Sequence, residues 1–227
     1  MQAAHDTDNI MPVAVKICCI QSVAEARLAI DHGAAAVGLV GPMPSGPGPI
    51  GDDQIAEITN AVGDSAMSVL LTSQTSADGV CGHVARTEPR AVQLVDEVDP
   101  DTYDALRNHF PDLTVLQVIH VRDAFDIVAA QDASERGCQI LLDSGAPDKA
   151  VKELGGTGRT HDWSLSRKIV ETVDQPVWLA GGLNPENVMM AIRTVRPFGV
   201  DLCSALRPKG ALDPLLLKRF MDQVVAV

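Results

Sequence analysis

Three segments in the last third of the chain have the residue types that bind a phosphate group. They read GGTGRTHDW from Gly155, WLAGGLNPENV from Trp178 and GVDLCSA from Gly199. Glycine lets backbone N–H groups approach an oxyanion, and a helix that starts just afterwards adds positive dipole. Gly181 and Gly182 close an apolar run, and the Asn-Pro-Glu that follows is typical of a helix N-terminus. One glycine pair also fits an ordinary tight turn, but three such segments favour an anion site.

Two further residues could move protons beside that site. The apolar run VAVKICCI ends in Cys18-Cys19, and the run CQILLDS contains Asp143 near its end. Strand alternation places Lys16 and Cys18 on one face and lets only one of the two adjacent cysteines point inward. A thiol near a cation and a phosphate can ionise near neutral pH, and a carboxyl group facing it could serve as an acid. The alternatives are a packed, inert cysteine and a helix-capping aspartate.

The remaining polar candidates are less specific. His161 could be a second acid or base, or a solvated loop residue, and Asp162 has the position of a helix N-cap. The five cysteines form no CxxC pair and no spacing that predicts a metal site. Their odd number favours a reducing compartment with free thiols, rather than disulfides.

Composition limits the partners. The 227 residues carry a formal net charge of -12, which disfavours nucleic acid and anionic membranes. Aromatic residues make up only 3% and hydrophobic residues 46%, a balance that favours a parallel sheet covered by helices. Residues 1–12 lack the features of a signal peptide and no apolar run is long enough to span a membrane. We expect a flexible leader, a cytoplasmic protein that is a monomer or homodimer, and a small anionic ligand.

Strand-length apolar runs alternate with amphipathic segments from Val13 onward. The predicted strands cover residues 13–20, 35–40, 67–73, 91–96, 114–121, 138–144, 176–182 and 199–205. The predicted helices cover residues 22–33, 52–62, 76–87, 100–110, 123–135, 163–173, 185–195 and 214–225. Eight such units predict a single α/β domain over 13–227, a (β/α)8 TIM barrel. A doubly wound open sheet would have fewer units and a glycine fingerprint after its first strand.

The barrel would bring the candidate residues together. Active sites of this fold lie at the carboxyl ends of the strands, and phosphate usually binds after strands seven and eight. The AGG and CSA tripeptides fall at those two ends, and Cys18 and Asp143 fall at the ends of strands one and six. The pattern thus favours proton transfer on a sugar phosphate.

Several motifs together resemble a known family. VKICCI, LLDSG, GGTGRTHDWSL, LAGGLNPENV, VRPFGVDLCSA and KGALD occur in an order and spacing similar to the phosphoribosylanthranilate isomerases of tryptophan biosynthesis. The resemblance extends over nearly the whole chain from Val13. It implies a cofactor-free Amadori rearrangement that converts a phosphoribosylamine of anthranilate into a 1-deoxyribulose phosphate.

The resemblance also assigns roles to residues. Cys18 would be the general base that takes the C2 proton of the sugar, and Asp143 the general acid that protonates the furanose ring oxygen. Asp201 falls where the family has another active-site carboxylate. The residues that would hold the phosphate through backbone N–H groups are Gly181, Gly182, Ser204 and Ala205. The loop that would close over the substrate includes Gly156, Gly158 and Arg159.

The chain departs from the family at the aromatic side of the site. Cys19 replaces the glycine of VKICG, and residues 43–49 contain no counterpart of the arginine that meets the anthranilate carboxylate. Arg159 or Arg207 could supply that cation. Besides the isomerase, two readings stay open: a phosphosugar enzyme with another substrate, and a silent barrel that only binds a phosphorylated metabolite.

Overall fold

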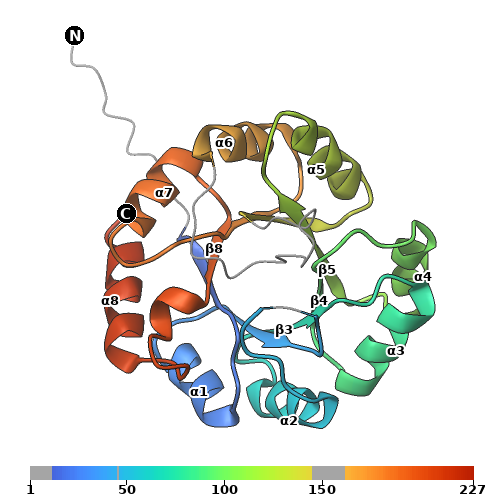
Figure 1. Ribbon diagram of the computed structural model, residues 1–227, viewed down its shortest axis with the longest axis horizontal. Coiled ribbons are helices and arrows are strands. Elements are labelled where there is room, and N and C mark those ends of the chain that lie inside the picture. The colour runs from blue at the N-terminus through green and yellow to red at the C-terminus, as the bar shows by residue number, and fades with distance from the viewer. Residues whose placement is uncertain (1–11, 45, 145–161) are drawn as a thin grey trace.

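The chain folds into a closed parallel barrel surrounded by helices (Figure 1). A computed structural model describes residues 12–44, 46–144 and 162–227. Over these residues the strands are β1 (Ala14–Ile17), β2 (Ala36–Val40), β3 (Met67–Thr72), β4 (Ala91–Leu94), β5 (Thr114–His120), β6 (Gln139–Asp143), β7 (Val177–Leu179) and β8 (Gly199–Leu202). They pair in sequence order, and β8 closes the ring on β1.

A helix follows each strand and covers the outside of the barrel. The helices are α1 (Val23–Asp31), α2 (Asp52–Val62), α3 (Ala77–Thr87), α4 (Asp101–His109), α5 (Phe125–Glu135), α6 (Trp163–Thr172), α7 (Val188–Val195) and α8 (Pro214–Val225). A 3-10 helix, η1 (Ser204–Leu206), lies between β8 and α8. The predicted TIM barrel is therefore confirmed, with the predicted order of elements.

The boundaries differ from prediction mainly at the carboxyl ends of the strands. β1 ends at Ile17 and β8 at Leu202, so the CCI and CSA segments leave the sheet and form the mouth of the barrel. Ser22 and Asp162 cap α1 and α6 as predicted, because their side chains accept hydrogen bonds from Glu25 N and Ser164 N. The leader predicted over residues 1–12 lies, except for Pro12, outside the described residues. No helix among the described residues is long and apolar enough to cross a membrane.

Helix α7 begins later than its sequence suggests. Asn184 Oδ1 accepts hydrogen bonds from the backbone N–H groups of Glu186 and Asn187, at 2.9 and 3.0 Å. Asn184 therefore caps a turn over Pro185, as the residue types predict. The regular α-helix starts only at Val188.

Strand alternation sorts the side chains into an inner and an outer core. Outward residues pack under the helices, whereas inward residues form a separate apolar cluster inside the barrel. Trp178 fills the amino-terminal end of the interior, where a Cβ on Gly199 would lie 2.5 Å from the indole ring. Its Nε1 donates to Gln139 Oε1 at 2.7 Å. With that end filled, the polar inward residues nearer the carboxyl ends are left to line a cavity.

Candidate active site

A cavity opens at the carboxyl ends of the strands, where the sequence predicts chemistry. Its cavity volume is about 80 Å³. Its walls include six of the predicted site residues, Cys18, Asp143, Gly181, Gly182, Asp201 and Ser204. Ala205 is not part of the wall, and Gly156, Gly158, Arg159 and His161 lie outside the described residues.

A buried ion pair lies beneath Cys18. Lys16 Nζ is 3.0 Å from Asp201 Oδ1, and the Lys16 side chain is completely buried. The β1–β8 register places these two residues side by side, since both are inward positions of neighbouring strands. Burial lowers the pKa of Lys16, but Asp201 and Cys18 more than offset this effect, so that the pKa is raised overall. Lys16 therefore keeps its positive charge inside the barrel. Lys16 and Cys18 both point into the interior, as their shared face of the strand predicts.

Cys18 has room because β2 carries a glycine opposite. A Cβ on Gly38 would lie 2.7 Å from Cys18 Sγ and 3.2 Å from Lys16 Nζ. Sequence reasoning missed Gly38, although an isolated glycine inside a strand signals the close approach of another group. Burial raises the pKa of the Cys18 thiol to about 11, while the neighbouring Lys16 ammonium opposes the shift. Lys16 is thus the main group that favours the thiolate, and the Cys19 backbone acts in the same direction.

Asp143 is buried at the end of β6, on the same cavity. Burial is the main reason that the pKa of its carboxyl group is raised to about 6, and the nearby Asp201 adds to the shift. The backbone N–H of Ser144 donates to Asp143 Oδ1 at 2.7 Å and acts in the opposite direction. A carboxyl group in this environment stays protonated up to a higher pH than an exposed one.

The glycine pair after β7 forms a fixed corner next to Asp143. Gly181 and Gly182 both have left-handed backbones, with φ of +83° and +63°. Asn187 Nδ2 donates to Gly182 O at 2.9 Å and holds this turn against the start of α7. A Cβ on Gly181 would lie 3.1 Å from Asp143 Oδ1 and 2.9 Å from Ser144 Oγ. Among the described residues, the amides of the glycine pair donate to no other group.

Beyond Cys203 and Ser204, which line the cavity, the segment after β8 is tied to α1. Arg207 is buried, and its Nη2 and Nη1 donate to the two carboxylate oxygens of Glu25 at 2.8 and 3.1 Å. Glu25 also accepts from the backbone N–H of Leu212 and Gln21. Arg207 is therefore a structural residue, and the expectation that it could replace the missing cation is wrong.

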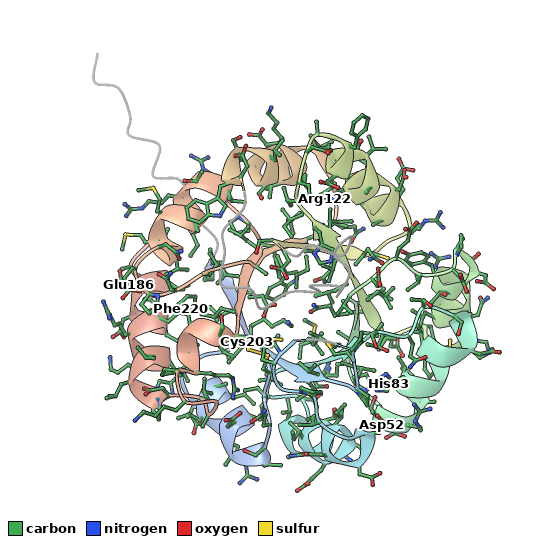
Figure 2. All side chains as sticks on the ribbon, viewed as in Figure 1. Asp52, His83, Arg122, Glu186, Cys203 and Phe220 are labelled. Carbon is green, nitrogen blue, oxygen red and sulfur yellow. A yellow bond between two sulfur atoms is a disulfide. The ribbon has the colours of Figure 1, made fainter. Side chains whose placement is uncertain are left out.

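The prediction that the cysteines are free is wrong for two of the five. Cys19 and Cys203 form a disulfide between the end of β1 and the end of β8. Figure 2 shows Cys203 inside the ring of helices, on the side of α1 and α8. Alternation also fails at Cys19: its φ is +63°, so the chain turns there, and Cys18 and Cys19 both line the cavity. The sequence did not predict this disulfide, because 184 residues separate the two cysteines.

The opposite wall of the cavity is apolar. It is built from Val40, Met43, Pro47, Leu71 and Val95. No arginine or lysine lines the cavity among the described residues.

One polar side chain in the floor was missed as a candidate. Gln93 is 5% exposed, and its Oε1 has no hydrogen-bond partner among the described residues. The sequence did contain a signal for it, because Gln93 is a polar residue between the apolar inward positions Ala91 and Val95.

Comparisons with known proteins identify the family of this chain. The family model for N-(5'-phosphoribosyl)anthranilate (PRA) isomerase matches residues 15–223. The N-(5'-phosphoribosyl)anthranilate isomerase of Methanocella arvoryzae is 34% identical over 211 residues, which cover 92% of this chain and 97% of the relative.

Solved structures give the same result. Phosphoribosyl anthranilate isomerase from Thermotoga maritima has a TM-score of 0.79 and 29% identity, covering 95% of this chain and 100% of its own. A phosphoribosyl anthranilate isomerase solved with reduced 1-(o-carboxyphenylamino)-1-deoxyribulose 5-phosphate has a TM-score of 0.76, 27% identity and the same coverage. This chain therefore belongs to the N-(5'-phosphoribosyl)anthranilate isomerase family.

Proposed function

We propose that this chain is an N-(5'-phosphoribosyl)anthranilate isomerase that uses Cys18 as general base and Asp143 as general acid. The observation that carries the proposal is the placement of this thiol and this carboxyl group on one cavity, beside a corner of left-handed glycines. Family membership supports the reaction, and the geometry supports the assignment of roles.

The environments of the two groups suit the two proton transfers. Asp143 keeps its proton nearer neutral pH because it is buried, so it can donate that proton to the furanose ring oxygen as the C1–O bond breaks. The ring opens to a protonated imine, and the Cys18 thiolate then removes the C2 proton. The resulting enolamine becomes the 1-amino-1-deoxyketose when C1 takes up a proton and the hydroxyl on C2 loses one to become the carbonyl. No redox partner is needed, since hydrogen moves only between carbons, oxygen and nitrogen of one substrate.

Lys16 supports the base directly, whereas Asp201 does so only by holding Lys16, since its own charge raises the pKa of Cys18. The raised pKa of Cys18 means that the thiolate is a minor form at neutral pH, and Lys16 is the adjacent charge that stabilises it. Asp201 holds that ammonium in place at 3.0 Å. We assign Asp201 to the site through this contact, together with its position in the cavity wall.

The phosphate would bind at the corner formed by Gly181, Gly182 and Ser204, with Ala205 contributing through its backbone. Three of these residues, Gly181, Gly182 and Ser204, line the cavity beside the carboxyl ends of β7 and β8, and backbone N–H groups at such positions are suited to an oxyanion. The role of Gly156, Gly158 and Arg159 in a loop that closes over the substrate remains a prediction. With Arg207 paired to Glu25, Arg159 is the remaining candidate for the cation that meets the substrate carboxylate. A cytoplasmic location and a monomeric or dimeric state also remain predictions.

A second candidate function follows from the apolar wall. Because no arginine or lysine lines the described part of the cavity, a phosphosugar isomerase whose acceptor lacks a carboxylate also fits. The two candidates differ in substrate, not in the proton-transfer groups.

One assay separates these possibilities. Freshly generated phosphoribosylanthranilate should be consumed by the purified protein, followed through the loss of anthranilate fluorescence. Cys18→Ser should lower kcat by about a hundredfold or more with KM nearly unchanged, because acid–base catalysis is lost. Cys81→Ser is the matched control, since Cys81 is a free cysteine on α3 that does not line the cavity.

The outcomes discriminate clearly. Equal rates for wild type and Cys18→Ser would refute the role of Cys18. A folded wild-type protein that binds ribose 5-phosphate but leaves phosphoribosylanthranilate unchanged would favour the second candidate.

A further inference from the structure

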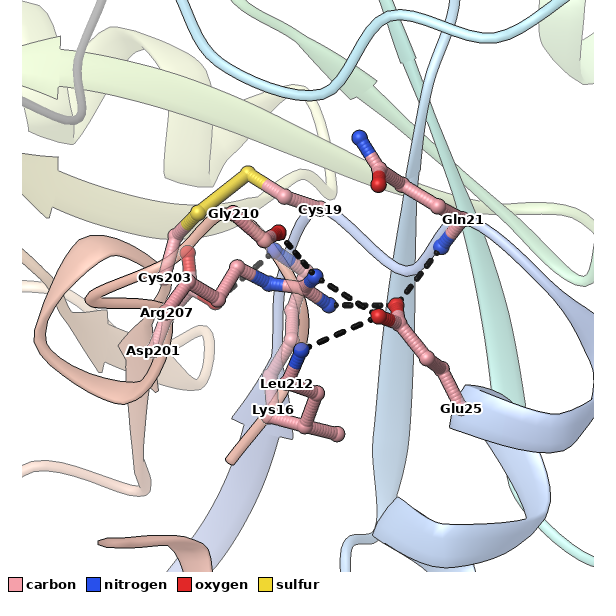
Figure 3. The surroundings of a disulfide bond; sticks show 9 residues. All are labelled: Lys16, Cys19, Gln21, Glu25, Asp201, Cys203, Arg207, Gly210 and Leu212. Carbon is pink, nitrogen blue, oxygen red and sulfur yellow. Dashed lines mark hydrogen bonds and ion pairs between the residues drawn. A yellow bond between two sulfur atoms is a disulfide. The ribbon is translucent and has the colours of Figure 1, made fainter. Parts of the chain in front are cut away.

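A covalent link joins the two strand ends that carry the proposed base and the proposed phosphate site. Cys19 directly follows Cys18, and Cys203 directly precedes Ser204 (Figure 3). Their Cα atoms are 6.0 Å apart, although 184 residues separate them in sequence. Both cysteines line the cavity, so the sulfur atoms belong to the wall of the site and not to a remote part of the surface.

The disulfide holds Cys19 in a backbone conformation that is unfavourable for a residue other than glycine. Cys19 has φ of +63°, a left-handed conformation that non-glycine residues rarely adopt. This conformation turns the Cys19 side chain toward β8 and leaves Cys18 pointing into the barrel. Cys18 is fixed from the other side by its backbone N–H, which donates to Leu202 O at 2.9 Å. The orientation of the thiol therefore depends on the turn that follows it.

The same side chain supports the loop between β2 and α2. A Cβ on Gly48 would lie 2.8 Å from the Cys19 Cβ, so this loop packs directly against the cysteine. The backbone N–H of Ile50 donates to Val40 O at 2.9 Å and holds the loop base to β2. Cys19 thus lies between the loop that forms the apolar wall and the strand end that leads to Ser204.

A second connection would survive loss of the disulfide. On the outer side of the same strand ends, Arg207 and Glu25 form a two-bond ion pair (Figure 3). This pair and the β1–β8 ladder hold the segments together in the reduced protein. Reduction should therefore loosen the cavity wall without unfolding the barrel.

We propose that the Cys19–Cys203 disulfide is a positioning element of the active site, which holds Cys18, Ser204 and the β2–α2 loop in their working geometry. The inference rests on the proposed isomerase function. A dithiol such as dithiothreitol would reverse it: two electrons and two protons convert the disulfide into two thiols, while the dithiol closes to its own cyclic disulfide. Because both cysteines line an open cavity, a small dithiol can reach them.

The test compares four states of the protein with phosphoribosylanthranilate as substrate. These are the oxidised wild type, the wild type reduced with dithiothreitol, Cys203→Ser, and the double variant Cys19→Gly/Cys203→Ser. Thiol titration in denaturant verifies each state, with three free thiols expected for the oxidised wild type. Circular dichroism checks that every variant remains folded.

We expect reduction to lower kcat/KM by roughly tenfold or more, because a small misplacement of reacting groups is costly. Cys203→Ser should show the same loss and should not respond to dithiothreitol. The double variant should recover only part of the activity, since glycine adopts the left-handed backbone at residue 19 unaided but does not hold Ser204 or the loop. Equal kcat/KM in the oxidised and reduced wild type would overturn the proposal, as would a double variant as active as the oxidised wild type.

A second readout keeps this test separate from the proposed function. If no state consumes phosphoribosylanthranilate, the isomerase assignment fails, and hydrogen exchange decides the role of the disulfide. Faster exchange of the amides of residues 18–20 and 203–206 on reduction would support a positioning role. Unchanged exchange in both segments would overturn it.

Discussion

The two sides of the cavity mouth are built in different ways. The polar side comes from β1, β6, β7 and β8 and comprises Cys18, Asp143, Gly181, Gly182, Asp201 and Ser204. The apolar side comes from β2, β3, β4 and the loop after β2 and comprises Val40, Met43, Pro47, Leu71 and Val95. The polar side is held by ion pairs and hydrogen bonds with defined partners, whereas the apolar side is held by packing.

This difference has energetic consequences. Buried charges on the polar side need their partners, because an unpaired charge in a low-dielectric interior is costly. Apolar contacts are less directional, and volume-conserving changes are usually tolerated. Substitutions on the polar side should therefore affect catalysis and stability together. Those on the apolar side should mainly change substrate recognition.

The largest effect should come from breaking the buried ion pair. Lys16→Met leaves the Asp201 carboxylate buried without its cation, and should lower the free energy of unfolding by about 3–5 kcal/mol. It should also lower kcat, because the Cys18 thiolate loses the ammonium that stabilises it. Urea unfolding at pH 7 measures the first effect, and the fluorescence assay measures the second.

The matched control is the double variant Lys16→Met/Asp201→Asn. It removes both charges, so we expect a much smaller loss of stability than in Lys16→Met, while kcat stays low. The single variant Asp201→Asn completes the comparison. If the stability losses of Lys16→Met and Asp201→Asn add up to the loss of the double variant, the two residues do not interact.

The next effect is pH-dependent and concerns Asp143. Its pKa is raised from 3.8 to about 6 in the folded protein, so ionisation disfavours folding. As the pH rises from about 4 to 6, the folded protein holds a proton that the unfolded chain has released, and the free energy of unfolding falls. Asp143→Asn removes this penalty and should stabilise the protein by about 3 kcal/mol at pH 8.

The gain should disappear near pH 4, where the carboxyl group is protonated in both the folded and the unfolded protein. Chemical unfolding at pH 4 and pH 8 tests this difference. Asp99→Asn, at an exposed position, controls for the loss of one negative charge. An Asp143→Asn variant with the same stability change at both pH values would contradict the buried, proton-holding carboxyl group. The variant should also lose kcat, so that stability and catalysis change in opposite directions.

A smaller effect is expected at the glycine corner. Gly181→Ala and Gly210→Ala both place alanine on a left-handed backbone, with φ of +83° and +85°, at a cost of roughly 1–2 kcal/mol each. Only at Gly181 would the new Cβ also meet Asp143 and Ser144, since nothing lies within 4 Å at Gly210. We therefore expect similar losses from backbone strain, with a loss of kcat/KM confined to Gly181→Ala. Equal activity in the two variants would mean that the corner does not position Asp143.

The sequence was informative where local rules decide the outcome. The alternation of apolar runs predicted the barrel, and the shared face of Lys16 and Cys18 placed both inside it. Helix-cap residues such as Ser22 and Asp162 were recognisable because their hydrogen bonds are local. The candidate cavity also followed from topology, since the strand ends of this fold meet at one mouth.

The features that the sequence did not predict depend on contacts between residues that are far apart in the chain. The disulfide joins the first and last strands, and the left-handed turn at Cys19 is unfavourable for a residue other than glycine. Arg207 looked available as a free cation, but its partner Glu25 lies 182 residues away. Gly38 shows its role only once the Cys18 thiol is placed opposite it.

The smallest effect should come from the apolar side, at the loop after β2. Gly48→Ala and Gly46→Ala both introduce alanine at positive φ, +77° and +105°. At Gly48 the new Cβ would lie 2.8 Å from the Cys19 Cβ, whereas at Gly46 the nearest described atom is Met43 Sδ, at 3.9 Å. Gly48→Ala should therefore displace the loop and raise KM several-fold, with kcat nearly unchanged, because the acid and base lie on the other side.

Gly46→Ala should carry a comparable strain of about 1 kcal/mol; although Gly46 lines the cavity, its new Cβ would meet only Met43, so KM should change less than in Gly48→Ala. Steady-state kinetics with phosphoribosylanthranilate, beside thermal unfolding of both variants, measures the two effects separately. A change in kcat rather than KM at Gly48 would mean that the loop acts on the proton-transfer groups. The two sides of the mouth would then work as one unit, joined through Cys19.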